Sequence, residues 1–139
     1  MVILGVDFGD ARTGLAACDK FEMMAHGEGC VAGGFKKALA GVAAKAKEIS
    51  AELIVVGNPL NMNGSAGARS EKCRDFAEAL MAETGIETVL YDERLTTVSA
   101  HRFLHDSGLD GRRHRDHVDE LSARLILEDY MTFRKNTSR

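Results

Sequence analysis

The sequence is poor in the features that mark several common protein classes. It contains no Trp and only two Tyr in 139 residues, so it offers no aromatic platform on which bases could stack. Its three cysteines, Cys18, Cys30 and Cys73, are widely spaced and form no CxxC pair, which argues against a disulfide framework and against a zinc site. The net charge of -3 provides no overall attraction to polyanions, so any nucleic-acid contact must come from local patches.

Long apolar runs are also missing. No uninterrupted stretch approaches the roughly 18 residues that cross a bilayer. The first residues carry neither a basic leader nor a small-residue cleavage site, so we expect a soluble, cytoplasmic protein without membrane contact. The length, with 45% hydrophobic and 28% charged residues, predicts one globular domain over residues 1–139, and we expect a monomer or homodimer.

Five apolar runs predict five β-strands. Three of them follow one another at residues 2–6, 14–18 and 23–31 with short polar segments between, which is typical of an antiparallel meander. Two later runs, 53–57 and 87–91, are short and continuous, as in central strands that are covered on both faces. A helical pattern precedes each of these two, so we expect them to join the sheet through parallel crossovers.

Helical periodicity predicts four helices around this sheet. Apolar residues recur at helical spacing over 35–49 and from 73 to a stop near Gly85. A third helix is expected over about 96–108, where Thr96 or Thr97 provides a cap, and a fourth over 116–131. Residues 132–139 are polar enough to form a frayed tail. The chain therefore reads as an α/β domain.

Two acidic residues stand directly after predicted strands. Asp7 follows the first strand, and Glu93 follows the fifth, at the strand ends where ligands collect in open α/β sheets. A carboxylate there is costly unless it is paired, hydrogen-bonded or bound to a metal. Ordinary structural roles remain open: Asp7 could form an Asx turn or cap a helix, and Asp92 or Glu93 could favour the start of the next helix or pair with Arg94.

A third acidic residue, Asp119, shares a helical stripe with small and apolar side chains rather than with the solvent-facing charges. The small residues Ser122 and Ala123 on the same stripe would let this helix approach the sheet closely. We therefore expect Asp119 to face inward, near the strand ends. The alternative is an early-helix acid that only favours the helix dipole.

Three acids that converge on one site indicate a hard cation, because Mg²⁺ binds carboxylate oxygens while keeping several waters. No His or Cys cluster offers softer ligands. With two ions about 3.5 to 4 Å apart, one activates water and the other stabilises the leaving oxygen of a phosphoryl displacement. We predict Asp7, Glu93 and Asp119 as catalytic residues and as ligands of Mg²⁺ or Mn²⁺.

Four motifs in order carry a family resemblance: GVDFGDARTG at residues 5–14, GNPLNMNG at 57–64, DERLTT at 92–97 and VDELSARLIL at 118–127. Together they closely resemble the YqgF family, also called RuvX, whose members are likened to Holliday-junction resolvases. The resemblance implies an RNase H-like fold with a mixed five-stranded sheet, three strands antiparallel and then parallel ones, flanked by helices. It also implies a metal-dependent nuclease that matures the 5′ end of precursor 16S ribosomal RNA in the bacterial cytoplasm.

By the same resemblance, the family's acidic residues correspond to Asp7, Glu93 and Asp119. Its other recurrent polar positions fall at or near four further residues, which we predict to contact nucleic acid: Arg12, Asn58, Arg69 and Thr96. Two residues depart from the family pattern. Asp10 stands where a small hydroxyl residue is usual, and Ser122 replaces an alanine. Asp10 would add negative charge beside the site.

Basic residues provide the remaining candidates for substrate contact. Arg113, within the basic loop 111–115, is expected to bind phosphate together with Arg12 and Arg69, although solvated surface arginines would look the same in sequence. The expected partner is structured RNA or branched DNA. Three other functions stay open: a Holliday-junction resolvase, an actin-like ATPase domain, and a catalytically silent module on the ribosome or the transcription machinery.

Overall fold

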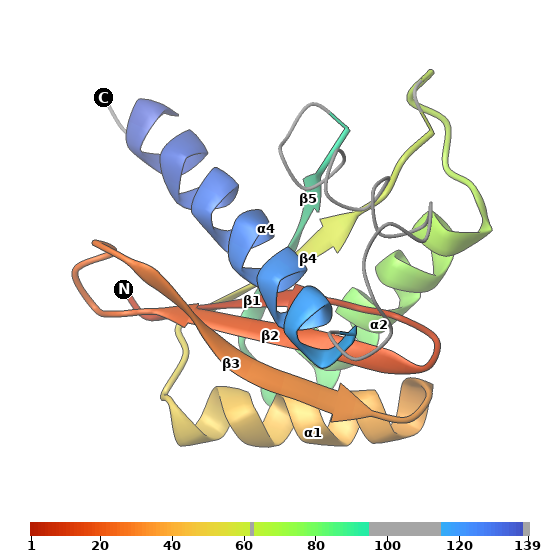
Figure 1. The fold of residues 1–139 in the computed structure, drawn as a ribbon, viewed down its shortest axis with the longest axis horizontal. Helices are drawn as coiled ribbons and strands as arrows, with labels where there is room; N and C mark the ends of the chain where they lie inside the picture. The colour runs from red at the N-terminus through yellow and green to blue at the C-terminus, as the bar shows by residue number, and fades with distance from the viewer. Residues whose placement is uncertain (62, 95–114, 138–139) are drawn as a thin grey trace.

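The computed structural model describes residues 1–61, 63–94 and 115–137, without the side chains of 115–118 (Figure 1). Five strands form one sheet: β1 (Ile3–Asp7), β2 (Arg12–Cys18), β3 (Ala25–Ala32), β4 (Leu53–Asn58) and β5 (Glu87–Asp92). Three helices lie in the described part of the chain: α1 (Phe35–Glu48), α2 (Ala68–Thr84) and α4 (Arg115–Thr137). None of these helices is long and apolar enough to span a bilayer.

The sheet has the order β3-β2-β1-β4-β5. The pairs β1–β2 and β2–β3 are antiparallel, whereas β1–β4 and β4–β5 are parallel. This arrangement confirms the mixed five-stranded sheet expected of an RNase H-like fold. It also places the carboxyl ends of β1, β4 and β5 at one edge of the sheet, since parallel strands run in the same direction.

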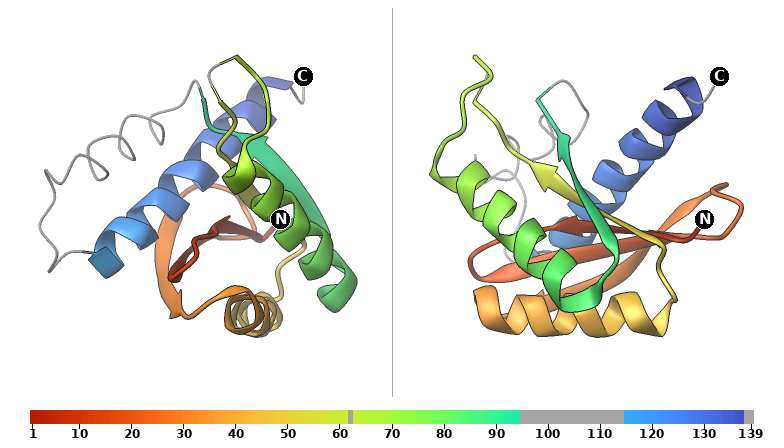
Figure 2. Two further views of the ribbon diagram at one scale, coloured as in Figure 1. Left: turned by 90° about the vertical axis from the view of Figure 1, so that its right-hand side faces the viewer. Right: turned by 180° about the vertical axis from the view of Figure 1, so that it is seen from behind.

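Helices cover both faces of the sheet. Figures 1 and 2 show α1 and α2 on one side and α4 crossing the other. Side chains alternate between the two faces along each strand. In β1, Leu4 and Val6 belong to the core under α1 and α2, as does Phe8 just after the strand, and Ile3 belongs to the core under α4. The alternation therefore divides the apolar residues of β1 between the two helix layers.

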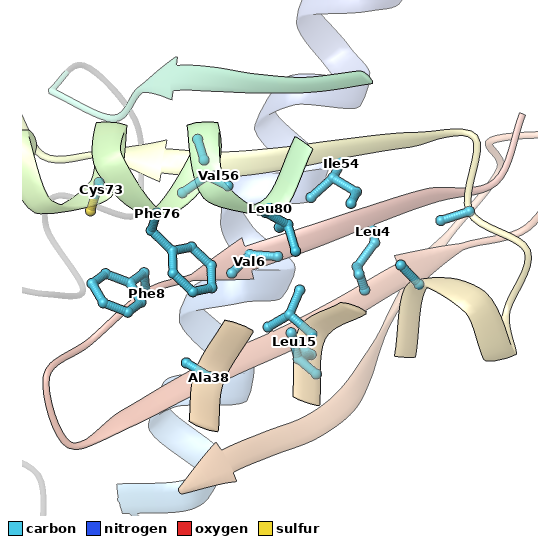
Figure 3. Close-up of a cluster of buried hydrophobic side chains, with 14 residues drawn as sticks. Leu4, Val6, Phe8, Leu15, Ala38, Ile54, Val56, Cys73, Phe76 and Leu80 are labelled. Carbon is cyan, nitrogen blue, oxygen red and sulfur yellow. The ribbon is translucent and has the colours of Figure 1, made fainter. Parts of the chain in front are cut away.

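The core under α1 and α2 is filled by large side chains (Figure 3). Phe76 of α2 is fully buried and stacks on Phe8, with ring centroids 4.3 Å apart, and Phe35 of α1 meets both rings edge-on. The helix that carries Phe76 ends at Gly85, whose left-handed φ of 71° suits a glycine C-cap. Three aromatic rings from three elements thus tie both helices to the end of β1.

The strands and helices agree closely with the sequence prediction, with corrections at some ends. β3 begins at Ala25 rather than near residue 23, and α2 begins at Ala68, earlier than the periodicity indicated. The expected frayed tail from residue 132 is wrong up to Thr137, because α4 continues to that residue. Arg134, in this extension, donates a hydrogen bond to Glu22 and so anchors the last turns to the β2–β3 connection. The helix predicted over 96–108 lies outside the described residues.

Candidate active site

Asp7 lies at the carboxyl end of β1 and is 7% exposed. Its neighbours two and four residues earlier, Gly5 and Ile3, face α4: a Cβ on Gly5 would come within 2.9 Å of the Leu127 side chain of that helix. Strand alternation therefore turns the Asp7 carboxylate to the α4 side, away from the aromatic core. It is the one acidic residue of β1, and it is buried where a charge requires compensation.

Two glycines flank Asp7 on the neighbouring strands. Gly14 of β2 pairs directly with it. On the other side, Val6 pairs with Val56 of β4, so Gly57 lies one position further, beside Asp7. Because neither glycine has a side chain, the surface of the sheet around the carboxylate is open toward α4. These two glycines are the sites at which the other two acidic residues approach.

Glu93 lies over Gly57. Its backbone N–H donates to the carbonyl oxygen of Asn58 at 3.3 Å, which extends the β4–β5 pairing past the end of β5. The side chain is 3% exposed, and a Cβ on Gly57 would lie only 2.5 Å from its Oε2 atom. The absence of a side chain at Gly57 thus creates the space that the Glu93 carboxylate occupies next to Asp7.

Asp119 comes from α4 and lies over Gly14. A Cβ on Gly14 would collide with the backbone carbonyl of Asp119, so only glycine permits the helix to come this close. The Asp119 carboxylate accepts an ion pair from the guanidinium of Arg12, with Nε and Oδ2 3.2 Å apart. The helical stripe that Asp119 shares with Ser122, Ala123 and Ile126 faces the sheet, since these three residues are buried. A third carboxylate therefore lies on the same face as Asp7.

The acid after Asp119 has a different task. Glu120 accepts a hydrogen bond from the backbone N–H of Gly29 at 2.7 Å, and a Cβ on Gly27 would collide with its carboxylate. Glu120 thus fastens the start of α4 to edge strand β3. This holds the turn that carries Asp119 over the sheet. The sequence contained a signal for this contact in the unusual pair of glycines within β3.

The donor set can be tested against the hard cation expected from the sequence. Asp7 and Glu93 present buried carboxylate oxygens on either side of Gly57, and oxygens of this kind are the ligands that Mg²⁺ and Mn²⁺ prefer. Within residues 1–61, 63–94 and 115–137, no three His, Cys, Asp or Glu side chains group closely enough to hold one ion. The fit is therefore to a cation held by two protein carboxylates and waters, with Asp119 nearby but bound to Arg12.

The other predicted contacts are distributed over both faces. Arg12 lies beside Asp119, on the carboxylate side. Asn58 follows Gly57 and so faces α2, where it accepts a hydrogen bond from Ser70 Oγ at 2.5 Å. Arg69 lies in the first turn of α2 and lines a cavity near the end of β1. Thr96 and Arg113 lie outside the described residues.

An ion pair between Asp92 and Arg94 lies beside the site. Arg94 donates to both carboxylate oxygens of Asp92, at 2.7 to 3.1 Å. These hydrogen bonds lower the pKa of Asp92 below its usual value, despite the partial burial that would raise it. Pairing of Asp92 with Arg94 is one of the ordinary roles that the sequence left open for this segment. Asp92 and Arg94 therefore brace the end of β5 from which Glu93 extends.

Comparison with known proteins identifies the family of this chain. The sequence pattern of the RuvX family, described as Holliday junction resolvase, matches residues 1–132. A protein of Agathobacter rectalis named as a candidate pre-16S rRNA nuclease is 38% identical over 141 residues, covering 99% of each chain. One from Moorella thermoacetica with the same name is 39% identical over 135 residues, covering 94% of each.

Among solved structures, RuvC of T. thermophilus in complex with a Holliday junction substrate has a similar fold, with a TM-score of 0.61. The sequences are 17% identical, and the match covers 99% of this chain and 97% of that one. At this identity the likeness concerns the fold, which is the RuvC-like form of RNase H. The family match over nearly the whole chain is more specific, and from it we conclude that this protein belongs to the RuvX family.

Proposed function

We propose that this protein is a metal-dependent nuclease that matures the 5′ end of precursor 16S ribosomal RNA in the cytoplasm. Its family and relatives make it a hydrolase of phosphodiester bonds. The observation that carries the metal dependence is the placement of Asp7 and Glu93, two buried carboxylates beside the side-chain-free Gly57. Two buried carboxylates side by side supply the oxygen ligands that a hard divalent cation prefers.

Asp7 and Glu93 would hold the cation, and Asp119 would complete its surroundings from α4. Mg²⁺ or Mn²⁺, when bound, supplies an activated water and stabilises the leaving oxygen of the phosphodiester. The protein's own contribution is to hold carboxylates in place before substrate arrives, which lowers the cost of assembling the site. Strand ends fix Asp7 and Glu93, and the Glu120–Gly29 hydrogen bond fixes the helix turn of Asp119.

Arg12 has a second effect on this site. Its guanidinium neutralises Asp119 at 3.2 Å, so it competes with a cation for that carboxylate. Arginine also binds phosphate well, through its forked N–H groups. We infer that substrate phosphate draws Arg12 toward itself as it binds, leaving Asp119 available to the cation. Binding of nucleic acid and of metal would then be mutually favourable.

The relatives' names favour precursor ribosomal RNA as the substrate, and the family description favours a Holliday junction. The decisive experiment compares precursor 16S RNA, a four-way DNA junction and single strands, each with Mg²⁺ or Mn²⁺. Wild-type protein is compared with Asp7→Asn and with Asp75→Asn, which changes an exposed aspartate of α2. We expect cleavage of the precursor RNA by wild type and Asp75→Asn, and none by Asp7→Asn.

Each other outcome identifies a rival. Cleavage of the junction in preference to RNA would make the protein a resolvase. Tight ATP binding without nuclease activity would favour an actin-like ATPase domain. Full cellular function of an Asp7→Asn, Glu93→Gln double variant would indicate a silent ribosomal module. Undiminished cleavage by folded Asp7→Asn would show that the site assignment is wrong.

A further inference from the structure

A cavity of about 270 Å³ opens next to the carboxyl end of β1, on the side of the sheet opposite the carboxylates. It lies between the loop that follows β1 and the first turn of α2. Its lining residues are Phe8, Gly9, Asp10, Ala68, Arg69 and Lys72. Phe8 is almost fully buried, so it forms a rigid apolar floor, and the polar groups are arranged around the rim. The cavity begins one residue beyond Asp7 in the chain.

The rim carries more positive than negative charge. Arg69 has no acidic partner within the described part of the chain, and it is exposed to solvent. Lys72 Nζ lies 3.2 Å from Asp10 Oδ1, in an ion pair whose side chains are 57% and 79% exposed. An uncompensated guanidinium beside an ammonium is an arrangement that binds phosphate, because both groups donate charge-assisted hydrogen bonds to its oxygens.

The size and position of the cavity fit a phosphate of a nucleic-acid strand. Its volume is several times the roughly 30 Å³ that one water occupies, so a phosphate group with its ester oxygens fits. Two residues separate Asp7 from Asp10, so the three steps of backbone between them span at most about 11 Å from the carboxylate site to the cavity rim. A strand that crosses the end of β1 can therefore reach both places at once.

We propose that this cavity, which we call the β1–α2 cavity, binds a backbone phosphate of the substrate next to the cleaved bond through Arg69 and Lys72, and that Asp10 weakens this binding. The proposal rests on the nuclease function proposed above. Asp10 acts against phosphate in two ways: it repels the phosphate as a like charge, and it holds Lys72 in an ion pair. Since this pair is exposed, breaking it costs little stability.

The test measures binding of a short single-stranded oligonucleotide and of precursor RNA, in an Asp7→Asn background that removes cleavage from the measurement. Arg69→Gln and Lys72→Gln are each expected to raise the Kd about threefold to tenfold and to reduce the slope of log K against log salt by about one. Asp10→Ser is expected to lower the Kd about twofold to fivefold. Arg74→Gln, on the next turn of α2, and Lys47→Gln, at the far end of α1, are the matched controls.

Two outcomes would overturn the proposal: Kd values and salt slopes of Arg69→Gln and Lys72→Gln equal to those of the controls, or inorganic phosphate that binds the same residues as tightly as the oligonucleotide does. The second would identify a free-phosphate site. Cleavage assays in the otherwise wild-type protein keep the two proposals apart. If cleavage is found but Arg69→Gln leaves KM unchanged, the proposed phosphate binding in the β1–α2 cavity is wrong and the proposed nuclease function is supported. If no cleavage is found but Arg69→Gln and Lys72→Gln still weaken binding, the cavity binds nucleic acid and the proposed nuclease function is wrong.

Discussion

The two faces of the sheet use the same strands for opposite purposes. On the face under α1 and α2, large side chains fill the core, and three phenylalanines pack against one another. On the face under α4, glycines stand at Gly5, Gly14 and Gly57, and the helix comes close enough that a Cβ on any of them would crowd a neighbour. Close backbone approach at the strand ends leaves room for carboxylates beside the aliphatic core under α4.

The difference teaches how one sheet supports both stability and chemistry. Burying a phenylalanine stabilises the fold by a few kcal/mol, whereas burying a carboxylate costs free energy unless a partner compensates it. The aromatic face therefore offsets the cost of the acidic one. Substitutions of buried residues should separate accordingly, with losses of catalytic rate at the carboxylates under α4 and losses of stability in the aromatic core under α1 and α2.

The largest effect is expected from Glu93→Gln on the α4 face. The amide keeps the shape of the side chain but removes its charge, so transition-state stabilisation of about 4 kcal/mol and roughly a thousandfold in rate should be lost. Stability should change little, because the amide keeps the volume and one acceptor oxygen of the buried side chain. Initial rates of RNA cleavage and a urea titration measure the two quantities. A large loss of stability would contradict a purely functional role for this carboxylate.

On the opposite face, Phe76→Ala is expected to destabilise the protein by about 3 to 5 kcal/mol, because it removes a fully buried ring and leaves a cavity between Phe8 and Phe35. The rate per folded molecule should stay within about a factor of two, since Phe76 lies across the sheet from the carboxylates. Denaturant unfolding gives the free energy, and Phe76→Leu serves as a milder control. A thousandfold loss of activity in the folded fraction would break the separation of faces.

Gly57→Ala should lower both the stability and the cleavage rate, because Gly57 lies against the Glu93 carboxylate and against the buried Ile126 side chain. The added Cβ would lie 2.5 Å from Glu93 Oε2 and from Ile126 Cδ1. Overpacking of this kind costs about 1 to 3 kcal/mol, and a displaced carboxylate slows the reaction about tenfold to a hundredfold. The control is Gly34→Ala, where the nearest heavy atom to a new Cβ is 3.9 Å away. Equal behaviour of the two variants would show that Gly57 does not shape the site.

The smallest effect concerns the far end of α4. Hydrogen bonds from Arg134 lower the pKa of Glu22 below its ordinary value of 4.5. A carboxyl group whose pKa is lower in the folded protein stabilises it fully above about pH 4.5 and progressively less as the pH falls through the folded value. Glu22→Gln should therefore lower the free energy of unfolding at neutral pH by about 0.5 to 1 kcal/mol. It should also reduce the loss of stability on acidification. Thermal melts from pH 3 to 7 test this, with Glu78→Gln as the control.

Much of this fold could be predicted because its signals are local. Strand alternation in β1 already separates Val6 from Asp7, and the helical stripe of α4 already turns Asp119 inward. The same alternation would have placed Asn58 on the α2 side, where the structure shows it bonded to Ser70. The end of α4 could not be predicted in this way, because residues 134–137 are polar and the only apolar side chain after Met131 is Phe133. Their helix is held by the ion pair of Arg134 with Glu22, a residue at the other end of the chain.

By itself, the sequence determined which residues alternate along each strand, which helices are amphipathic, and that acidic residues follow β1 and β5. These properties depend on neighbours a few positions away. Only the tertiary structure decided that Glu93 lies over Gly57, that Asp119 lies over Gly14 and that Arg12 holds Asp119. The crossing of α4 over the sheet brings these groups together, and close packing between residues distant in sequence sets that crossing.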